Sequence, residues 1–405
     1  MACGSQSPPV PNRRLHTFRG SLRCPTTAFV LALALGASLA VGAGAFCAQA
    51  RAGVATGLCD DRLQPGLGAV AAAADVREAT SGLHARWMRI NCLWSRLEPI
   101  RGQYDQAELA RLDGLVNTFH ASGVSILVTV YACPRWASDS GFWAFPPPGV
   151  SPGYQPYYPM KSSALADFGK LGEQLARRYA GEVQAMECWN EPNMWRFLYP
   201  QRTTGRPSFA AQTYLRMLKA FASGVRRSGS DIRVVAGSTT SYGADDQFQT
   251  DPLRFARFLK RGRAARWFDV YSCHPYTPGG SVHTAPDAIP DHPGRTVTLG
   301  NLGALLRVFA DKAFYITEYG YNTRPSVDFG LFAVSEQLQA SYLRRAYAVA
   351  ARHSQVKVLI WYLVQDVAAA AGRPADEGVY TGLRRADGTR KPSWRAFAAL
   401  RGMGG

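Results

Sequence analysis

The chain has 405 residues, of which 47% are hydrophobic and 11% aromatic, and its formal net charge is +17. The hydrophobic fraction excludes an intrinsically disordered chain, and neither a collagen repeat nor a coiled-coil heptad is visible. The length suits one large α/β domain or two smaller domains. The basic charge would suit a nucleic-acid-binding protein, so that class has to be weighed against the other features.

The first 50 residues predict a secretory signal that does not belong to the fold. Four arginines between residues 13 and 23 form a leader without acidic residues, the stretch 28–47 is uncharged and apolar, and Ala-Gln-Ala at 48–50 is a cleavage candidate. Because the stretch 28–47 is long enough to span a bilayer, an uncleaved signal anchor is the alternative. Both interpretations place residues 51–405 outside the cytoplasm. This part keeps 42 basic and 29 acidic side chains, a net charge of +13.

From residue 51 onward, short apolar segments alternate with longer segments of helical periodicity. In chain order we expect a strand at 54–59, a helix at 66–81, a strand at 85–93, a helix at 105–121, a strand at 124–130, a helix at 164–179, a strand at 183–189, a helix at 211–227, a strand at 232–237, a helix at 252–261, a strand at 268–273, a helix at 299–310, a strand at 313–317, a helix at 335–353, a strand at 356–363 and a final helix at 392–400. Strict alternation of eight strands with helices implies a parallel sheet with right-handed crossovers. The pattern favours a single (β/α)8 TIM barrel, of the α/β class, over residues 51–405. A doubly wound dinucleotide-binding fold has no support, because no Gly-x-Gly-x-x-Gly follows the first strand.

The aromatic residues gather in loops after the third and fourth strands. The segment 139–160 is rich in proline and contains six aromatic residues: Phe142, Trp143, Phe145, Tyr154, Tyr157 and Tyr158. Long loops at the carboxyl ends of barrel strands commonly build the active site. Trp136, Trp143, Trp195 and Phe197 are therefore candidates for stacking on a sugar, with Trp136 foremost, and ordinary loop packing is the alternative.

Five cysteines follow residue 50, namely Cys59, Cys92, Cys133, Cys188 and Cys273. They are scattered through a large domain, unlike the disulfide framework of a small secreted scaffold. We expect buried thiols that behave as small hydrophobic side chains, with one or two disulfides as the alternative. No metal site is expected, because none of them has the closely spaced ligands that such a site needs.

Two glutamates end strands on opposite sides of the expected barrel. Glu191 ends the fourth strand in Asn190-Glu191-Pro192, and Glu318 ends the seventh in Glu-Tyr-Gly. Both carboxyl groups can face one central cleft, because the carboxyl ends of all eight strands meet at one face of a barrel. Glycoside hydrolysis needs such a pair: one carboxyl protonates the leaving oxygen, and the other attacks the anomeric carbon or activates water. Glu187, deeper in the fourth strand, is expected to be a buried structural acid.

Asn190-Glu191 together with Glu318 resembles the catalytic signature of the clan A glycoside hydrolases, which are retaining (β/α)8 enzymes. Three further stretches are similar to family 39 and to cellulase-like family 5 enzymes. They are Trp-Ser-Arg-Leu-Glu-Pro at 94–99, Gly-Gln-Tyr-Asp at 102–105 and Lys-Pro-Ser-Trp at 391–394. The likeness extends over residues 54–397.

The resemblance implies that Glu191 is the general acid and base and that Glu318 is the nucleophile. Five further side chains are implied to line or support the sugar site: Arg89, Asn190, His274, Tyr276 and Trp361. Asn190 would bind the hydroxyl next to the anomeric carbon, Arg89 would keep Glu318 ionised, and Trp361 would form the floor under the sugar. No cofactor is implied.

The sequence therefore predicts an exported retaining hydrolase of O-glycosidic bonds in an extracellular or cell-envelope oligo- or polysaccharide. A retaining transglycosylase on the same site and a catalytically silent glycan-binding barrel are the alternatives. Nucleic-acid binding is disfavoured by export. A basic run at 254–266 contains Arg254, Arg257, Lys260, Arg261, Arg263 and Arg266. It is most simply a solvated helix face, and attraction to an anionic cell envelope or acidic glycan is the other interpretation.

Overall fold

The computed structural model describes residues 53–65, 69–279, 284–327 and 330–402. Residues 49–405 form one compact unit. The expected signal at 1–50, with its apolar stretch 28–47, lies outside the described residues. None of the described helices has the length and apolar character needed to cross a membrane.

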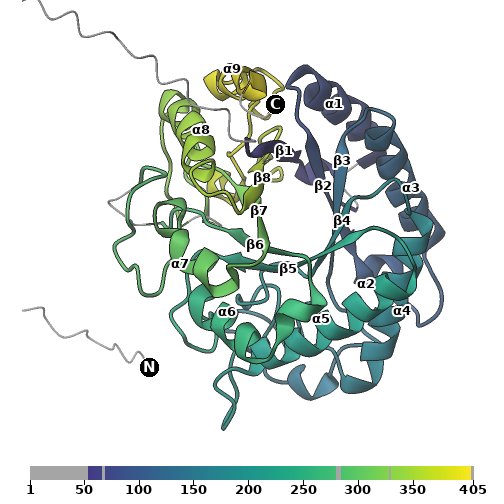
Figure 1. Cartoon of the computed structure of the whole chain (residues 1–405). Helices are drawn as coiled ribbons and strands as arrows, with labels where there is room; N and C mark the ends of the chain where they lie inside the picture. The colour runs from purple at the N-terminus through teal and green to yellow at the C-terminus, as the bar shows by residue number, and fades with distance from the viewer. Residues whose placement is uncertain (1–52, 66–68, 280–283, 328–329, 403–405) are drawn as a thin grey trace, which may run out of the picture. The chain divides into compact units, whose positions relative to one another are not determined.

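Eight parallel strands close into a barrel in the order in which they follow one another along the chain (Figure 1). They are β1 (Ala55–Cys59), β2 (Trp87–Leu93), β3 (Ser125–Tyr131), β4 (Ala185–Cys188), β5 (Arg233–Thr240), β6 (Val270–His274), β7 (Ala313–Tyr319) and β8 (Val356–Tyr362). β1 pairs with β8 over five residues, which closes the sheet. The predicted (β/α)8 barrel is confirmed, and each strand lies within a few residues of its predicted range.

The helices surround the barrel (Figure 1). They are α1 (Ala69–Gly82), α2 (Trp94–Leu97), α3 (Gln106–His120), α4 (Leu165–Arg178), α5 (Phe209–Arg227), α6 (Pro252–Arg261), α7 (Gly303–Leu306), α8 (Glu336–Ala350) and α9 (Pro392–Ala398). Several begin where the sequence supplies a cap. The side chains of Asp105, Asp251 and Ser335 accept hydrogen bonds from the first backbone N–H groups of α3, α6 and α8.

The single helix predicted at 299–310 is wrong. The segment instead contains a 3-10 turn (Leu299–Asn301), the one-turn α7 and a second 3-10 turn (Arg307–Phe309). The side chain of Asn301 accepts a hydrogen bond from the backbone N–H of Thr298 and donates one to the carbonyl of Thr296. Asn301 and Thr298 thus form a capping box at the first turn. Gly300 and Gly303, both poor helix formers, interrupt the segment that follows.

The barrel interior is built in layers, because alternate residues of a strand face the same side. Buried apolar side chains form one layer: Trp87, Leu127, Ala185, Val270 and Tyr315. Two residues further along the same strands, buried polar side chains form the next: Arg89, Thr129, Glu187, Ser272 and Thr317. The polar layer lies nearer to the carboxyl ends of the strands, directly beneath the ends that carry the predicted site.

All five cysteines after residue 50 are buried and unpaired. Burial raises the pKa of each thiol. The expectation of buried thiols is confirmed, and the disulfide alternative is not met.

Helices α4 and α5 approach so closely that glycine is required where they cross. A Cβ atom added at Gly224 in α5 would lie 1.8 Å from the carbonyl oxygen of Gly169 in α4. Gly114 in α3 offers a contrast, because a Cβ atom there would meet no atom within 4 Å. The sequence pattern alone does not distinguish these two helical glycines.

Substituting Gly224→Ala should lower the free energy of unfolding by about 2–3 kcal/mol, because the methyl group forces two backbones apart. Gly114→Ala lowers the backbone entropy of the unfolded chain by the same amount without causing a clash. It should therefore raise the free energy of unfolding by up to about 1 kcal/mol. Urea unfolding of both variants measures the difference. Equal effects in the two helices would contradict the close approach.

Candidate active site

Glu191 is held by an unusual backbone conformation just after β4. Trp189 and Glu191 have φ angles of 73° and 36°, in the left-handed region that non-glycine residues rarely adopt. The backbone N–H of Glu191 donates to the carbonyl of Ser238 at 3.0 Å, which fixes this turn to the end of β5. Strain of this kind is concentrated at functional sites. It directs the Glu191 carboxyl into the mouth of the barrel.

Glu318 is held by two side chains from elsewhere in the barrel, Arg89 of β2 and Tyr276 just after β6. Nη1 of Arg89 lies 2.5 Å from Oε1 of Glu318, and the Tyr276 hydroxyl donates to Oε2 at 3.1 Å. Nη2 of Arg89 also donates to Oδ1 of Asn190 at 2.7 Å. Since its oxygen is occupied in this way, Asn190 has its amide N–H groups available to donate to a ligand.

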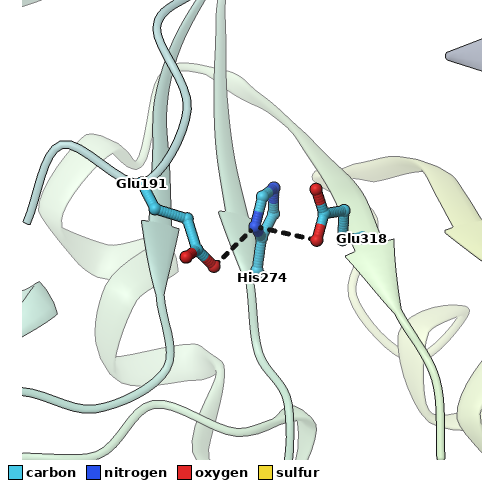
Figure 2. A group of neighbouring side chains, drawn as sticks. All are labelled: Glu191, His274 and Glu318. Carbon is cyan, nitrogen blue, oxygen red and sulfur yellow. Dashed lines mark hydrogen bonds and ion pairs between the residues drawn. The ribbon is translucent and has the colours of Figure 1, made fainter. Parts of the chain in front are cut away.

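The two carboxyl groups meet across His274 of β6 (Figure 2). Its Nδ1 atom lies 2.9 Å from Oε1 of Glu191 and 3.5 Å from Oε2 of Glu318. One oxygen of each glutamate and the imidazole nitrogen all lie within 4.8 Å of one another. The sequence-predicted residues Arg89, Asn190, Glu191, His274, Tyr276 and Glu318 are thus brought together.

Glu187 lies beneath this group as a fully buried carboxylate. It accepts hydrogen bonds from the hydroxyls of Thr129 and Ser272, both at 2.7 Å, and of Thr317 at 2.9 Å. Burial would raise the pKa of Glu187, but Arg89 and His274 outweigh it and hold this pKa below its usual range. The expectation of a buried structural acid is confirmed.

The ionised Glu187 determines where His274 carries a proton. Thr317 must donate its only hydroxyl proton to this carboxylate, so it accepts from Nε2–H of His274, 3.1 Å away. Burial would lower the pKa of His274, but the charges of Glu318 and Glu191 raise it above its usual value. The raised pKa favours a proton on Nδ1 as well, which Nδ1 would donate to Glu191 at 2.9 Å. The donor set therefore fits a hydrogen-bonded group better than a metal centre.

A cavity of about 300 Å³ opens beside Glu191 and Glu318. Its aromatic lining comes from Phe197, Tyr242, Tyr276 and Tyr362. Its size and its mixture of aromatic and polar walls suit a sugar ring, which offers both apolar faces and hydroxyls.

The prediction that Trp361 forms the floor of the site is wrong by one residue. Trp361 is fully buried, its indole N–H donates to the carbonyl of Thr381 at 2.9 Å, and it does not line the cavity. On β8 the interior positions are Val358 and Ile360, so the next inward side chain is that of Tyr362. Tyr362 lines the cavity, and its hydroxyl donates to Oδ2 of Asp61 at 2.5 Å.

Trp136 also lies away from this cavity. Its indole N–H donates to the carbonyl of Glu98 at 2.8 Å, and its ring packs edge-on against Trp94. Within the 139–160 segment, Trp143 packs against Tyr154 and Arg135. Of the four stacking candidates, Phe197 lines the cavity, and loop packing explains the positions of the other three.

Sequence reasoning missed Tyr242 and Tyr362 as cavity residues. Tyr242 follows the end of β5 by two residues, so the rule that pointed to Glu191 and Glu318 could also have found it. Predicting Tyr362 would require knowing which side chains of β8 point into the barrel, and a continuous apolar run does not reveal this.

A closed parallel barrel with two carboxyl groups opposed at the carboxyl ends of β4 and β7 defines the class of protein as a (β/α)8 glycosidase barrel. The family description "Cellulase (glycosyl hydrolase family 5)" matches residues 68–365. The chain therefore belongs to this family of O-glycosyl hydrolases.

Three solved structures show the same fold. A family 39 glycoside hydrolase from Bacteroides cellulosilyticus WH2 is 20% identical, with a TM-score of 0.62 over 87% of this chain and 64% of that one. GH5_18 from Streptomyces cattleya, in complex with GlcNAc, is 14% identical, with a TM-score of 0.59 over 87% and 80%. A β-glucosidase from Thermotoga maritima is 14% identical, with a TM-score of 0.60 over 87% and 98%. This chain thus spans just under two thirds of the family 39 structure, and no curated protein sequence matches it.

Substitutions at Trp361 and Tyr362 should separate packing from sugar contact. Tyr362→Ala removes part of the cavity wall and should lower kcat/KM on an aryl glycoside at least about tenfold. Trp361→Phe removes a buried hydrogen bond and should lower the free energy of unfolding by about 1–2 kcal/mol. It should change kcat/KM less than about threefold. Loss of activity in Trp361→Phe but not in Tyr362→Ala would instead support the prediction that Trp361 forms the floor under the sugar.

Asp61 should make stability depend on pH. Burial raises its pKa to about 6, and the charge of Glu318 acts in the same direction, against the hydrogen bond from Tyr362. The folded chain therefore holds this proton more tightly than the unfolded chain. This contribution is fully present below about pH 4 and is lost as the pH rises through 6.

As the pH rises from 4.5 to 7.5, the free energy of unfolding of Asp61→Asn should therefore increase by about 1–2 kcal/mol relative to that of the wild type. Urea unfolding across this range measures the gain. Asp113→Asn is the control, because Arg178 and Tyr179 lower the pKa of Asp113 and its contribution is nearly constant above pH 5. If the free energies of unfolding of Asp61→Asn and the wild type differed by the same amount at every pH, the raised pKa of Asp61 would be contradicted.

Proposed function

We propose that this chain is an exported retaining glycoside hydrolase that cleaves O-glycosidic bonds of an extracellular or cell-envelope glycan by double displacement. The observation that carries the proposal is the separation of Glu191 and Glu318, whose facing oxygens lie within 4.8 Å of each other. Retaining enzymes have carboxyl groups about 5–5.5 Å apart, whereas inverting enzymes need about 6.5–9.5 Å to admit a water molecule.

In the first step, Glu318 attacks the anomeric carbon and Glu191 protonates the leaving oxygen. The bond between the anomeric carbon and the glycosidic oxygen breaks, and an ester bond to Glu318 forms. Glu318 suits the nucleophile's role because Arg89 and Tyr276 hold both of its oxygens. Asn190 can donate its amide protons to the neighbouring sugar hydroxyl, which strengthens binding as charge develops.

In the second step, Glu191 acts as base for the water molecule that hydrolyses the ester. Esterification removes the negative charge of Glu318, which lies 3.5 Å from Nδ1 of His274. Without that neighbouring charge, the pair formed by Glu191 and His274 holds its shared protons less tightly. The change of role from acid to base follows from this loss of charge.

The proposed location and substrate are supported by features outside the catalytic pair. Export rests on the leader, apolar stretch and cleavage candidate within residues 1–50. The similar structures include a β-glucosidase, a GlcNAc complex and an exo-β-1,4-mannosidase, so they favour no single sugar for this chain. A transglycosylase would use the same residues and pass the sugar from Glu318 to an acceptor hydroxyl.

Azide rescue of two matched variants tests the roles of the two glutamates. Glu318→Gly should lower kcat on an activated aryl glycoside at least about 1000-fold, and azide should restore turnover with an inverted glycosyl azide. Glu191→Ala should retain the first step on this substrate, and azide should give a retained glycosyl azide. Product configuration is read by NMR.

Full activity of Glu318→Gly, or exchanged product configurations, would refute the assignment. Glycan binding without turnover by the wild type would favour the silent barrel. Product diverted to an added sugar acceptor in preference to water would favour the transglycosylase.

A further inference from the structure

The outer wall of the barrel carries a group of cations that form no ion pair with any acidic side chain of the described residues. We call them the basic face: Lys219, Arg226, Arg257, Arg261, Arg263 and Arg266. They lie on α5, on α6 and around the 3-10 helix η4 (Ala264–Trp267), and all six are exposed. Within the described ranges, none of the six forms an ion pair. The neighbouring pairs belong to other cations, Lys260 with Asp311 and Arg227 with Glu173.

The basic face is continuous, because α5, α6 and η4 pack against one another. α5 and α6 are neighbours in the ring of helices (Figure 1). Three of the cations converge on one partly buried ring. Lys219, Arg226 and Arg266 each lie 5.6–5.7 Å from the ring centroid of Trp267. The partly buried ring of Trp267, which also packs against the hydrophobic core, is thus contacted by three of the six cations.

Helix stabilisation alone does not explain the basic face. Cations near the carboxyl end of a helix interact favourably with its dipole. In α4, however, the two terminal arginines are paired, Arg177 with Glu173 and Arg178 with Asp113. The six cations of the basic face gain no such partner and repel one another. Unpaired like charges on one surface favour an anionic partner from outside the chain.

The position of the basic face leaves the active site free. α5 and α6 run back from the carboxyl ends of the strands, so their last turns lie at the rim where the strands begin. Glu191 and Glu318 lie at the opposite rim. β1 also begins at the first rim. A surface bound at this rim leaves the cavity open to substrate.

We propose that the basic face docks the enzyme on an anionic phospholipid surface. A lipid surface fits better than a single acidic glycan chain, because the charges spread over three elements of a convex wall. Trp267 fits the same interpretation, since tryptophan favours the boundary between lipid and water. Each arginine or lysine near an anionic bilayer adds attraction, and salt weakens it.

Vesicle cosedimentation of residues 49–405 tests the proposal without the apolar stretch. This compact unit contains the whole closed barrel. It should bind phosphatidylcholine vesicles that contain phosphatidylglycerol, and not vesicles of phosphatidylcholine alone. The fourfold variant Arg257→Gln, Arg261→Gln, Arg263→Gln and Arg266→Gln should bind at least about tenfold more weakly.

The matched control removes the same charge from the other side of the barrel. Arg77, Arg344, Arg352 and Arg395 are exposed arginines on or beside α1, α8 and α9. Their fourfold replacement by Gln should weaken vesicle binding less than about threefold. Thermal unfolding of both variants, and their hydrolysis of an aryl glycoside, should match the wild type, because neither set lies near the cavity.

Three results would overturn the proposal. They are equal weakening by the two fourfold variants, failure of the wild type to bind the anionic vesicles, and binding to polygalacturonate in place of the vesicles. The last result would identify an acidic glycan as the partner. None of them bears on the roles of Glu191 and Glu318, which are tested separately by azide rescue.

Discussion

The guanidinium of Arg89 is the interaction on which both the barrel and its site depend. From β2 it reaches Thr129 on β3, Glu187 on β4 and Glu318 on β7, and so ties four strands together. Without it, Glu187 would be an unpaired carboxylate in the barrel interior, and such a group typically costs several kcal/mol. The same cation orients Glu318 and Asn190. The requirement to neutralise a buried charge and the requirement to position a nucleophile are met by one side chain.

The other side chains of the site are held in fixed positions because they lie at or near strand ends. The buried polar side chains directly beneath them are hydrogen-bonded to one another. Glu187 accepts from three hydroxyls, and one of these, on Thr317, accepts in turn from Nε2–H of His274. His274 in turn lies between the two glutamates of the site (Figure 2). A chain of hydrogen bonds thus transmits the geometry of the core to the reacting groups, and no mobile loop is needed to hold them.

The barrel and most of the site follow from the sequence because parallel strands buried on both faces are nearly continuous apolar runs. Asn190-Glu191 and Glu318 were predictable because their motifs end such runs. The same continuity conceals which side chains point inward, and for that reason Trp361 was expected where Tyr362 lies. The break at 299–310 lies where the backbone of Gly300 closely approaches that of Ala288, and the position of Trp136 depends on its packing against Trp94. Both are tertiary contacts that local periodicity does not encode.

The five buried cysteines have a practical consequence for work on this molecule. The thiolate is the reactive form, and burial both shields these sulfurs and raises their pKa. Within the described barrel, a cysteine introduced on the surface would therefore be the one readily alkylated by a maleimide. The unit of residues 49–405, which contains only these five cysteines, therefore suits the attachment of a single fluorophore or spin label at a chosen rim. The orientation of the barrel on a surface could then be measured without first removing these thiols.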